Sequence, residues 1–503
     1  MRKTAIGVAL CAAALIVAQA AAAQGPGQGF RSLEQQVVER TLPNGLHVLI
    51  LPRAGAPVVS MVTYADVGGV DENQNRTGLA HIFEHMAFKG TKTVGTKDLA
   101  REMEALKKED EAFLALRAER LRRPKPDAAR LKELEAVFAA AKEEAAKVVD
   151  VGRFGQILEQ EGAQGLNAYT SLDQTVYIYS LPSNKLELWA ALESDRFTNP
   201  VLREFYKEKD VIMEERRMGM STPSRRLLED FFAVAYKAHM YRSLVIGHMS
   251  DLQGISRDDA AAWFKRYYGA RNLTAVIVGD VDPAAAWPML EKWLGQIPPG
   301  EKPGPVTTEE PPQLGEKRLV MEDASQPMMF VGYHRPSAAD PDAAAYNALS
   351  TVLSGGPSSR LYRSLVKEKQ LALNAQTVAA LGEKYPGLFI FMATPNRGRS
   401  NAECEAAIDA EIERLKNEPV SAEELAGVKA KARSGLINRL SDNLNLAVEL
   451  ASTQNVKGDW RLLFRELDDI DRVTPADIQR IAQKTFVKSN RTVAAIETVR
   501  PAK

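Results

Sequence analysis

Residues Ile255–Val281 read ISRDDAAAWFKRYYGARNLTAVIVGDV, and residues Val473–Val499 read VTPADIQRIAQKTFVKSNRTVAAIETV. The two stretches can be laid over one another without a gap. Each copy predicts a helix that begins with a capping box, then a turn, then a strand rich in β-branched residues. The strands are expected at Leu273–Val278 and Arg491–Ile496. The copies begin 218 residues apart, which indicates a duplicated unit of about 220 residues; chance similarity is the alternative, because few positions are identical.

Proline and glycine are concentrated at residues 299–317, which predicts a linker between the copies. We therefore expect an N-terminal half at residues 30–298 and a C-terminal half at residues 318–500. Each half pairs consecutive strands with long helices; the strands are expected at Leu46–Leu51, Val58–Val67, Arg318–Met321 and Met328–Tyr333. Consecutive strands favour antiparallel pairing, so the predicted fold class is α+β. It consists of two homologous α/β-sandwich halves, each an antiparallel sheet with helices packed on it.

The segment from Lys97 to Val149 differs in composition from the rest of the N-terminal half. Ala, Leu, Glu, Lys and Arg dominate it, and the pattern breaks once, at Arg123-Pro124-Lys125-Pro126-Asp127. Because proline ends helices and aspartate caps them, we expect two amphipathic helices that form an αα-hairpin inserted at residues 97–149. A projecting, solvated hairpin and a partner-binding arm both fit this composition.

The N-terminus carries the pattern of a secretion signal. Arg2 and Lys3 precede an apolar run that ends at Ala21-Ala22-Ala23, so we expect residues 1–23 to be cleaved on export, to the periplasm in a Gram-negative cell. A retained membrane anchor is the alternative. No later segment has about 18 uninterrupted apolar residues, so no stable membrane insertion is expected after cleavage. The chain has 65 basic and 65 acidic residues, and this balance gives no reason to expect nucleic acid as a partner.

His81-Ile82-Phe83-Glu84-His85 gives the clearest indication of chemistry. On a helix His81 and His85 share one face, and Glu84, three residues from His81, joins it. Two imidazoles at this spacing can bind zinc, and the carboxylate beside them can take a proton from an attacking water. The order His-x-x-Glu-His inverts the commoner zinc-protease order. A surface helix with two solvated histidines is the alternative, but the apolar neighbours from Phe83 to Phe88 argue against it.

Two histidines leave a catalytic zinc site incomplete, so a third protein ligand is needed. The segment from Glu208 to Glu215 supplies candidates. Glu208 and Glu215 are seven residues apart, two helical turns, and therefore share a face. One can bind the metal while the other accepts a hydrogen bond from a ligand histidine. An exposed acidic helix without metal is the alternative, and spacing alone does not decide between them.

Several motifs, taken in order, resemble the pitrilysin/insulinase family of inverted-motif zinc peptidases, and in particular its half-size branch that includes the mitochondrial processing peptidase. The matching segments are Gly78–Thr91, Leu166–Ser171, Glu208–Glu215, Tyr241–Gly247, Tyr268–Gly279 and Gly355–Tyr362. The resemblance covers most of residues 38 to 499. It implies a zinc metalloendopeptidase that hydrolyses peptide bonds in peptides or unfolded segments.

The resemblance also assigns roles to single residues. It implies one zinc ion per chain with three protein ligands: His81, His85 and Glu215. Glu84 is then the general base, and Glu208 is the glutamate that hydrogen-bonds a ligand histidine. Asn167 and Ala168 form the strand edge that binds the substrate backbone.

The chain departs from the family in two places. The gap from His85 to Glu215 is 130 residues, longer than usual by about the length of segment 97–149, and an insertion there leaves both helices intact. Active relatives commonly carry an arginine and a tyrosine where this chain has Val366 and Leu373, neither of which can donate a side-chain hydrogen bond. Full-size relatives enclose substrate between two bowl-like parts, and this chain supplies one. We therefore expect a dimer, either of two copies of this chain or, as the missing pair favours, with a paralogous non-zinc subunit that supplies that pair.

Two other functions fit the same fold. One is a catalytically silent structural or peptide-binding subunit, which the complete set of metal-binding residues and Glu84 argue against. The other is a peptide-binding or cofactor-maturation partner in which zinc is only structural. The remaining histidines have no ligand-like spacing and are interpreted as packing or surface residues: His47, His239, His248 and His334.

Overall fold

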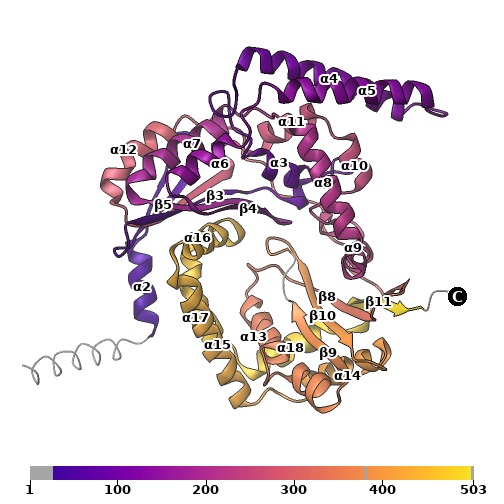
Figure 1. The fold of residues 1–503 in the computed structure, drawn as a ribbon. Helices are drawn as coiled ribbons and strands as arrows, with labels where there is room; N and C mark the ends of the chain where they lie inside the picture. The colour runs from indigo at the N-terminus through magenta and orange to yellow at the C-terminus, as the bar shows by residue number, and fades with distance from the viewer. Residues whose placement is uncertain (1–25, 379–381, 500–503) are drawn as a thin grey trace, which may run out of the picture.

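The computed structural model describes residues 26–378 and 382–499, with side chains from residue 31 onward. Figure 1 shows two halves, each built on one β-sheet, with the N-terminal half above the C-terminal half. The predicted signal peptide, residues 1–23, lies outside the described residues. Within the described part, no helix combines the length and the apolar character needed to cross a membrane.

The N-terminal half contains a six-stranded sheet in the order β1-β2-β6-β3-β5-β4. The strands are β1 (Val38–Thr41), β2 (His47–Pro52), β3 (Val58–Ala65), β4 (Gln164–Thr170), β5 (Thr175–Pro182) and β6 (Leu273–Gly279). Neighbouring strands are antiparallel except β2 and β6, which are parallel. Strand β4 forms one edge of this sheet, so one side of its backbone has no strand partner among the described residues.

The C-terminal half contains a five-stranded sheet in the order β7-β11-β8-β10-β9. The strands are β7 (Lys317–Asp323), β8 (Met328–Arg335), β9 (Ala372–Val378), β10 (Gly387–Pro395) and β11 (Arg491–Thr498). This order repeats β2-β6-β3-β5-β4, and the pair β7–β11 is again parallel. The predicted α+β class is confirmed. Each sheet is mixed because its last strand returns after a long helical connection, which allows parallel entry.

Most of the chain is helical. The helices are α2 (Pro26–Gln36), α3 (Leu79–Met86), α4 (Leu99–Arg120), α5 (Ala128–Ala146), α6 (Arg153–Gln160), α7 (Leu186–Thr198), α8 (Phe205–Met220), α9 (Pro223–Ala235), α10 (Met249–Gly254), α11 (Arg257–Tyr267), α12 (Pro283–Leu294), α13 (Ala343–Ser354), α14 (Asn401–Asn417), α15 (Ala422–Ser441), α16 (Asn443–Lys457), α17 (Glu466–Arg472) and α18 (Pro475–Thr485). The equivalent helices α11 and α18 both begin with the predicted capping boxes. Helices α3, α7, α11 and α12 contribute to the core on one face of the N-terminal sheet.

Each half covers its remaining sheet face with a helix from the other half. Helix α16 packs against β3 and β6, where Leu446 and Leu450 join the same buried core as Val62 and Val276. In return, α9 packs on the C-terminal sheet through Phe231 and its neighbours. Figure 1 shows both contacts, α16 under the upper sheet and α9 beside β8 and β11. The two sheets are thus tied together by reciprocal burial of apolar surface.

Helices α4 and α5 form a hairpin that projects from the N-terminal half (Figure 1). The Asp127 carboxylate caps α5 by accepting the backbone N–H groups of Ala129 and Arg130. Residues 299–316 contain no helix or strand. They are nevertheless held in place, because Glu310 accepts three backbone N–H groups from residues 237–239, at 2.6, 2.8 and 3.0 Å.

Candidate metal centre and active site

Helix α3 carries the His-x-x-Glu-His sequence and begins at a sharp turn. Gly78 precedes it with φ of 95°, a left-handed conformation that favours glycine. The buried Glu72 carboxylate accepts the N–H groups of Gly78 and Ala80, both at 2.8 Å. These bonds satisfy backbone donors that the first turn of a helix leaves unpaired. Ile82 and Phe83 are buried in the N-terminal core, which directs the histidines to the opposite face.

The structure brings His81, His85 and Glu215 together. One ligand atom from each lies within 4.8 Å of the others, and His81 Nε2 is 3.7 Å from Glu215 Oε2. This last distance is close to the separation of about 3.4 Å between two ligands of a tetrahedral zinc ion. Among the described residues no fourth His, Cys, Asp or Glu joins the group, which leaves a coordination position for water. The donor set of two imidazoles and a carboxylate therefore fits a catalytic zinc ion.

The protonation state of His81 also suits a metal ligand. Burial, with the nearby charges of His85 and Arg225, lowers the pKa of His81 to about 4. Its imidazole is therefore neutral at pH 7, and neutral imidazole is the form that binds metal. The neighbouring Glu214 points elsewhere, since it is exposed and pairs with Arg217 at 2.6 Å.

Glu208 lies beside His85, as the seven-residue spacing on α8 requires. His85 Nδ1 is 3.4 Å from Glu208 Oε2, and Lys89 Nζ donates to the other oxygen. Although burial works in the opposite direction, these two contacts lower the pKa of Glu208 to about 2. An ionised Glu208 holds the Nδ1–H of His85 and leaves Nε2 free for a metal.

Glu84 lies on the same helix face but outside the group of three ligands. Its Oε2 accepts a hydrogen bond of 2.6 Å from the Thr170 hydroxyl. Burial raises the pKa of the Glu84 carboxyl, and the bond from Thr170 and the charge of His85 only partly oppose it. Among the described residues, Thr170 is the side chain that donates to this carboxylate.

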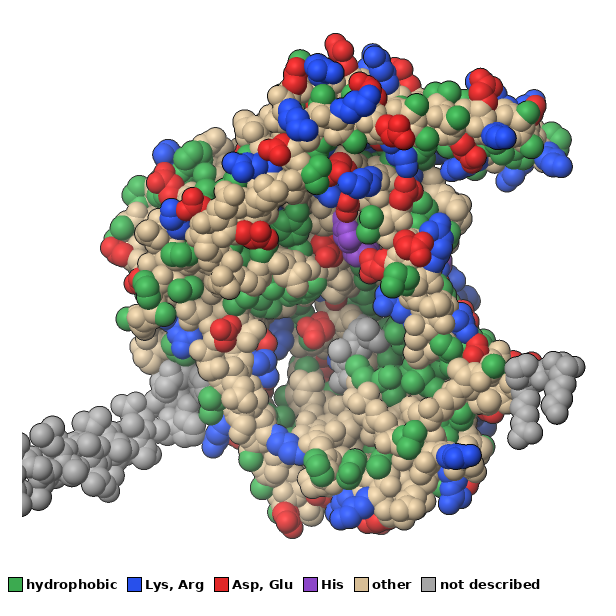
Figure 2. Space-filling view, viewed as in Figure 1, with side chains coloured by type: hydrophobic (Ala, Val, Ile, Leu, Met, Phe, Trp, Pro, Cys, Tyr) green, Lys and Arg blue, Asp and Glu red, His purple; other side chains and the backbone are tan. Residues whose placement is uncertain are grey.

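The predicted substrate-binding residues lie on the edge strand next to α3. Asn167 and Ala168 pair with Ile178 and Tyr177 of β5, so the outer side of β4 stays available for another strand. Figure 2 shows histidine side chains at the open front of the upper half, with acidic side chains beside them. The three ligands keep part of their side chains exposed, 14% for His81, 24% for His85 and 49% for Glu215.

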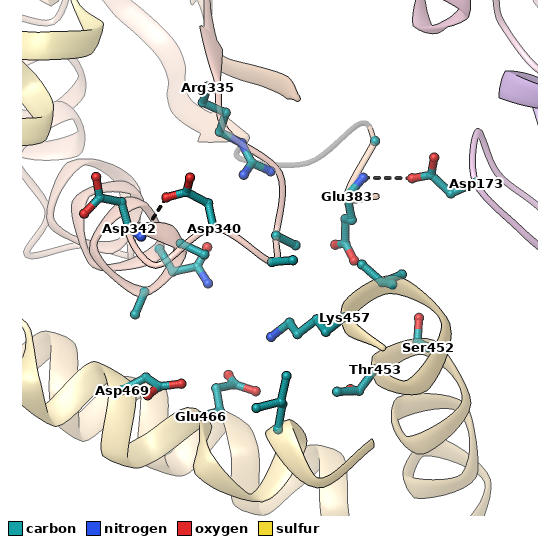
Figure 3. Close-up of a pocket in the computed structure, with 18 of the residues that line it drawn as sticks. Asp173, Arg335, Asp340, Asp342, Glu383, Ser452, Thr453, Lys457, Glu466 and Asp469 are labelled. Carbon is teal, nitrogen blue, oxygen red and sulfur yellow. Dashed lines mark hydrogen bonds between the residues drawn. The ribbon is translucent and has the colours of Figure 1, made fainter. Parts of the chain in front are cut away.

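A cavity of about 1260 Å³ lies between the two halves, and Thr170, the last residue of β4, is one of its lining residues. Its walls come from both halves, and the side chains of Arg335 and Lys457 point into it (Figure 3). Figure 3 also shows the backbone N–H of Glu383 bonded to Asp173, which links the halves at the cavity wall. The cavity therefore reaches the end of β4 at Thr170, while Glu84 and the three metal-binding residues are not among its lining residues.

Thr170 has no role of its own in the sequence predictions, although the structure bonds it to Glu84. Thr170 belongs to Leu166–Ser171, one of the segments that resemble the family. That resemblance is the sequence feature that could have indicated a role for it. Each of the other four histidines contacts a carboxylate, a backbone group or aromatic rings outside the metal group: His47, His239, His248 and His334. Val366 packs against the C-terminal core, and Leu373 is exposed on β9.

Known protein families match both halves. The model of the insulinase family, peptidase family M16, matches residues 48–117 and 143–247, and that of the peptidase M16 inactive domain matches residues 254–432. The chain belongs to peptidase family M16. The first match is interrupted at residues 118–142, which are the end of α4, the turn and most of α5, so most of α4 falls within the family match. The second fits a half in which the described residues show no metal-binding group.

Individual M16 relatives have similar length. The zinc protease PqqE of Helicobacter pylori is 25% identical over 470 residues, which cover 91% of this chain and 92% of that protein. The probable mitochondrial-processing peptidase subunit beta of Schizosaccharomyces pombe is 23% identical over 486 residues, 91% of each chain. The crystal structure of a protease from Helicobacter pylori has a TM-score of 0.76 at 24% identity and covers 92% of this chain and 99% of that chain. This chain is therefore a half-size M16 protein.

Proposed function

We propose that this chain is a zinc-dependent endopeptidase that cleaves peptides or unfolded segments. One observation carries the proposal: His81, His85 and Glu215 gather as a ligand set beside Glu84, a carboxylate that is not needed as a ligand. The name of the Helicobacter pylori relative, a zinc protease, agrees with it.

The residues around the ligands divide the work of hydrolysis. When bound, zinc supplies a Lewis acid that polarises the scissile carbonyl and activates a water. Glu84 accepts the proton of the attacking water and delivers it to the amide nitrogen as the C–N bond breaks. Glu208 keeps the ring of His85 oriented. The free side of β4, at Asn167 and Ala168, takes the substrate as an added strand, which requires an extended segment and so favours peptides or unfolded chains.

Replacement of Glu84 by Gln tests the proposal. We expect bound zinc to stay at the wild-type level, while peptide turnover falls by at least about 10²-fold, because proton transfer by a positioned side chain contributes 10²–10⁴. Glu214→Gln is the matched control, since Glu214 is an exposed glutamate that bonds only to Arg217 among the described residues. Turnover of Glu84→Gln within a few-fold of wild type would refute the assignment.

We also propose that the active form is a dimer with a paralogous, non-zinc subunit. Val366 and Leu373 offer no hydrogen-bond donor for the developing oxyanion, and loss of one such donor costs about 10²–10³ in rate. We expect the purified chain alone to be slow and to gain activity on mixing with a paralogue that carries the arginine and tyrosine. Full activity of the chain alone, unchanged by any paralogue, would contradict the heteromeric form.

The apolar residues at these two positions also favour the second candidate function, a catalytically silent peptide-binding subunit in which zinc is only structural. Chelation of zinc separates the two. If the ion is catalytic, its removal leaves the fold intact and abolishes hydrolysis. If the ion is purely structural, its removal unfolds the region around it. For localisation we propose the periplasm, from the signal pattern at residues 1–23, and N-terminal sequencing of the exported protein tests it.

A further inference from the structure

Thr170 connects the substrate edge to the general base. It is the last residue of β4, two positions after Ala168, so both side chains lie on the same face of the strand. That face packs against α3. The Thr170 hydroxyl donates to Glu84 Oε2 at 2.6 Å, across 86 positions of sequence. One end of the substrate-binding strand is therefore bonded to the carboxylate proposed to move the proton.

The orientation of Glu84 needs such a contact. The last torsion of a glutamate side chain is broad, so the carboxylate rotates easily when neither oxygen is held. Because the Thr170 hydroxyl binds Oε2, this bond leaves Oε1 free to accept from an attacking water. Glu215 and His85 both lie close enough to act on the charge of Glu84, with opposite signs. A carboxylate released from the Thr170 hydroxyl would therefore be free to rotate away from this orientation.

Thr170 is itself held in place from both halves of the molecule. The turn after it is closed by the Ser171 N–H, which donates to Gln174 at 2.8 Å. Asp173, in the same turn, accepts the backbone N–H groups of Glu383 and Lys384 at 2.8 and 3.2 Å. The Tyr241 hydroxyl binds the other oxygen of Asp173, at 2.5 Å. The hydroxyl of Thr170 is therefore fixed by a turn that the C-terminal half helps to close.

We propose that Thr170 is a positioning residue whose hydroxyl holds Glu84 in the orientation for proton transfer. The inference rests on the proposed peptidase activity and deepens it. A merely structural role would affect folding or zinc binding, whereas this role affects the chemical step.

Two substitutions at this position separate the hydroxyl from the shape of the side chain. Thr170→Val keeps the shape and removes the donor, and Thr170→Ser keeps the donor. We expect Thr170→Val to lower kcat by about 10- to 100-fold, the rate equivalent of one charge-assisted hydrogen bond. KM, zinc content and thermal midpoint stay near wild type, and Thr170→Ser restores kcat to within about three-fold. In the Glu84→Gln background, Thr170→Val causes no further loss, because the two residues act as a unit.

A crystal structure of Thr170→Val gives a readout that does not depend on activity. We expect the Glu84 carboxylate to leave its wild-type position while the two histidines stay. An unchanged kcat in Thr170→Val, no recovery in Thr170→Ser, or an unmoved Glu84 overturns the inference. If wild type shows no zinc-dependent hydrolysis, the proposed function fails instead, and the position of Glu84 in the two structures still decides whether Thr170 orients it.

Discussion

Replacement of Glu102 by Gln tests how the base of the hairpin supports the site. Glu102 on α4 accepts two hydrogen bonds from Arg203, from Nε at 2.7 Å and from a terminal nitrogen at 3.2 Å. Both side chains are buried, with 1% of Arg203 and 0% of Glu102 exposed. The same guanidinium donates to the carbonyls of Lys89, Thr91 and Val94, at 2.7, 2.6 and 2.8 Å. One arginine thus joins the hairpin, the loop after α3 and the approach to α8.

The expected loss of stability follows from this burial. Removal of one partner from a buried ion pair costs about 3–5 kcal/mol, because the other charge is left uncompensated. Glutamine keeps one oxygen that can accept from Arg203, so we expect a value near the lower end, about 3 kcal/mol. Because Arg203 also fixes the chain between the His81–His85 helix and the Glu215 helix, zinc affinity should fall as well.

Chemical denaturation of Glu102→Gln and of a control variant measures the free energy of unfolding of each. Glu133→Gln is the matched control, since Glu133 lies on the same hairpin and pairs with Arg130 at exposures of 61% and 49%. An exposed pair contributes about 0–1 kcal/mol, so this variant should unfold close to wild type. A loss below about 1 kcal/mol for Glu102→Gln, or equal losses in the two variants, would refute the reasoning, because burial is what distinguishes them.

Three further predictions concern the ligands, the hairpin and pH. Glu215→Gln should lose zinc while Glu214→Gln keeps it; metal analysis of both decides, and loss from the Glu214 variant alone would reverse the assignment. Deletion of residues 118–142 should leave zinc content unchanged, whereas deletion of 97–149 should destabilise the fold by removing the carboxylates bonded to two buried arginines, as thermal unfolding can show. Burial lowers the pKa of Lys209 to about 7, so the unfolded chain binds more protons between pH 7 and 10 and stability should rise with pH there, by at most about 1.4 kcal/mol per unit. Lys209→Met should lack this rise in denaturation midpoints, and an identical rise would contradict it.

The sequence predicted those parts of the site that depend on local periodicity. His81 and His85 face one way because four residues make one helical turn, and Glu208 and Glu215 share a face because seven make two. The repeat predicted the equivalent helices α11 and α18 and the equivalent strands β6 and β11. Each of these depends on residues close together in the chain.

Contacts between distant segments could not be predicted in the same way. Glu102 lies in a segment whose composition is typical of a solvated helix. Its burial depends on Arg203, which is 101 positions away in the sequence. The bond from Thr170 to Glu84 spans 86 positions, and no periodicity connects them. The parallel pairing of β2 with β6 likewise depends on where a long helical connection returns to the sheet.

The exchange of helices connects the C-terminal half, whose described residues hold no metal-binding group, to the metal site. Helix α3, with His81 and His85, is packed against the N-terminal sheet. Helix α8, with Glu215, leads after two residues into α9, and Arg216 binds Glu229 across the two helices at 2.8 Å. Helix α9 is buried against the C-terminal sheet, where the ring of Phe231 lies 5.7 Å from that of Phe330. Two ligands are therefore fixed by one sheet, and the third lies on a helix whose continuation is fixed by the other. A shift of the C-terminal sheet against the N-terminal sheet therefore acts on the Glu215 helix through α9, and it is opposed by Tyr206 and Ile212 of α8, which are buried in the N-terminal core.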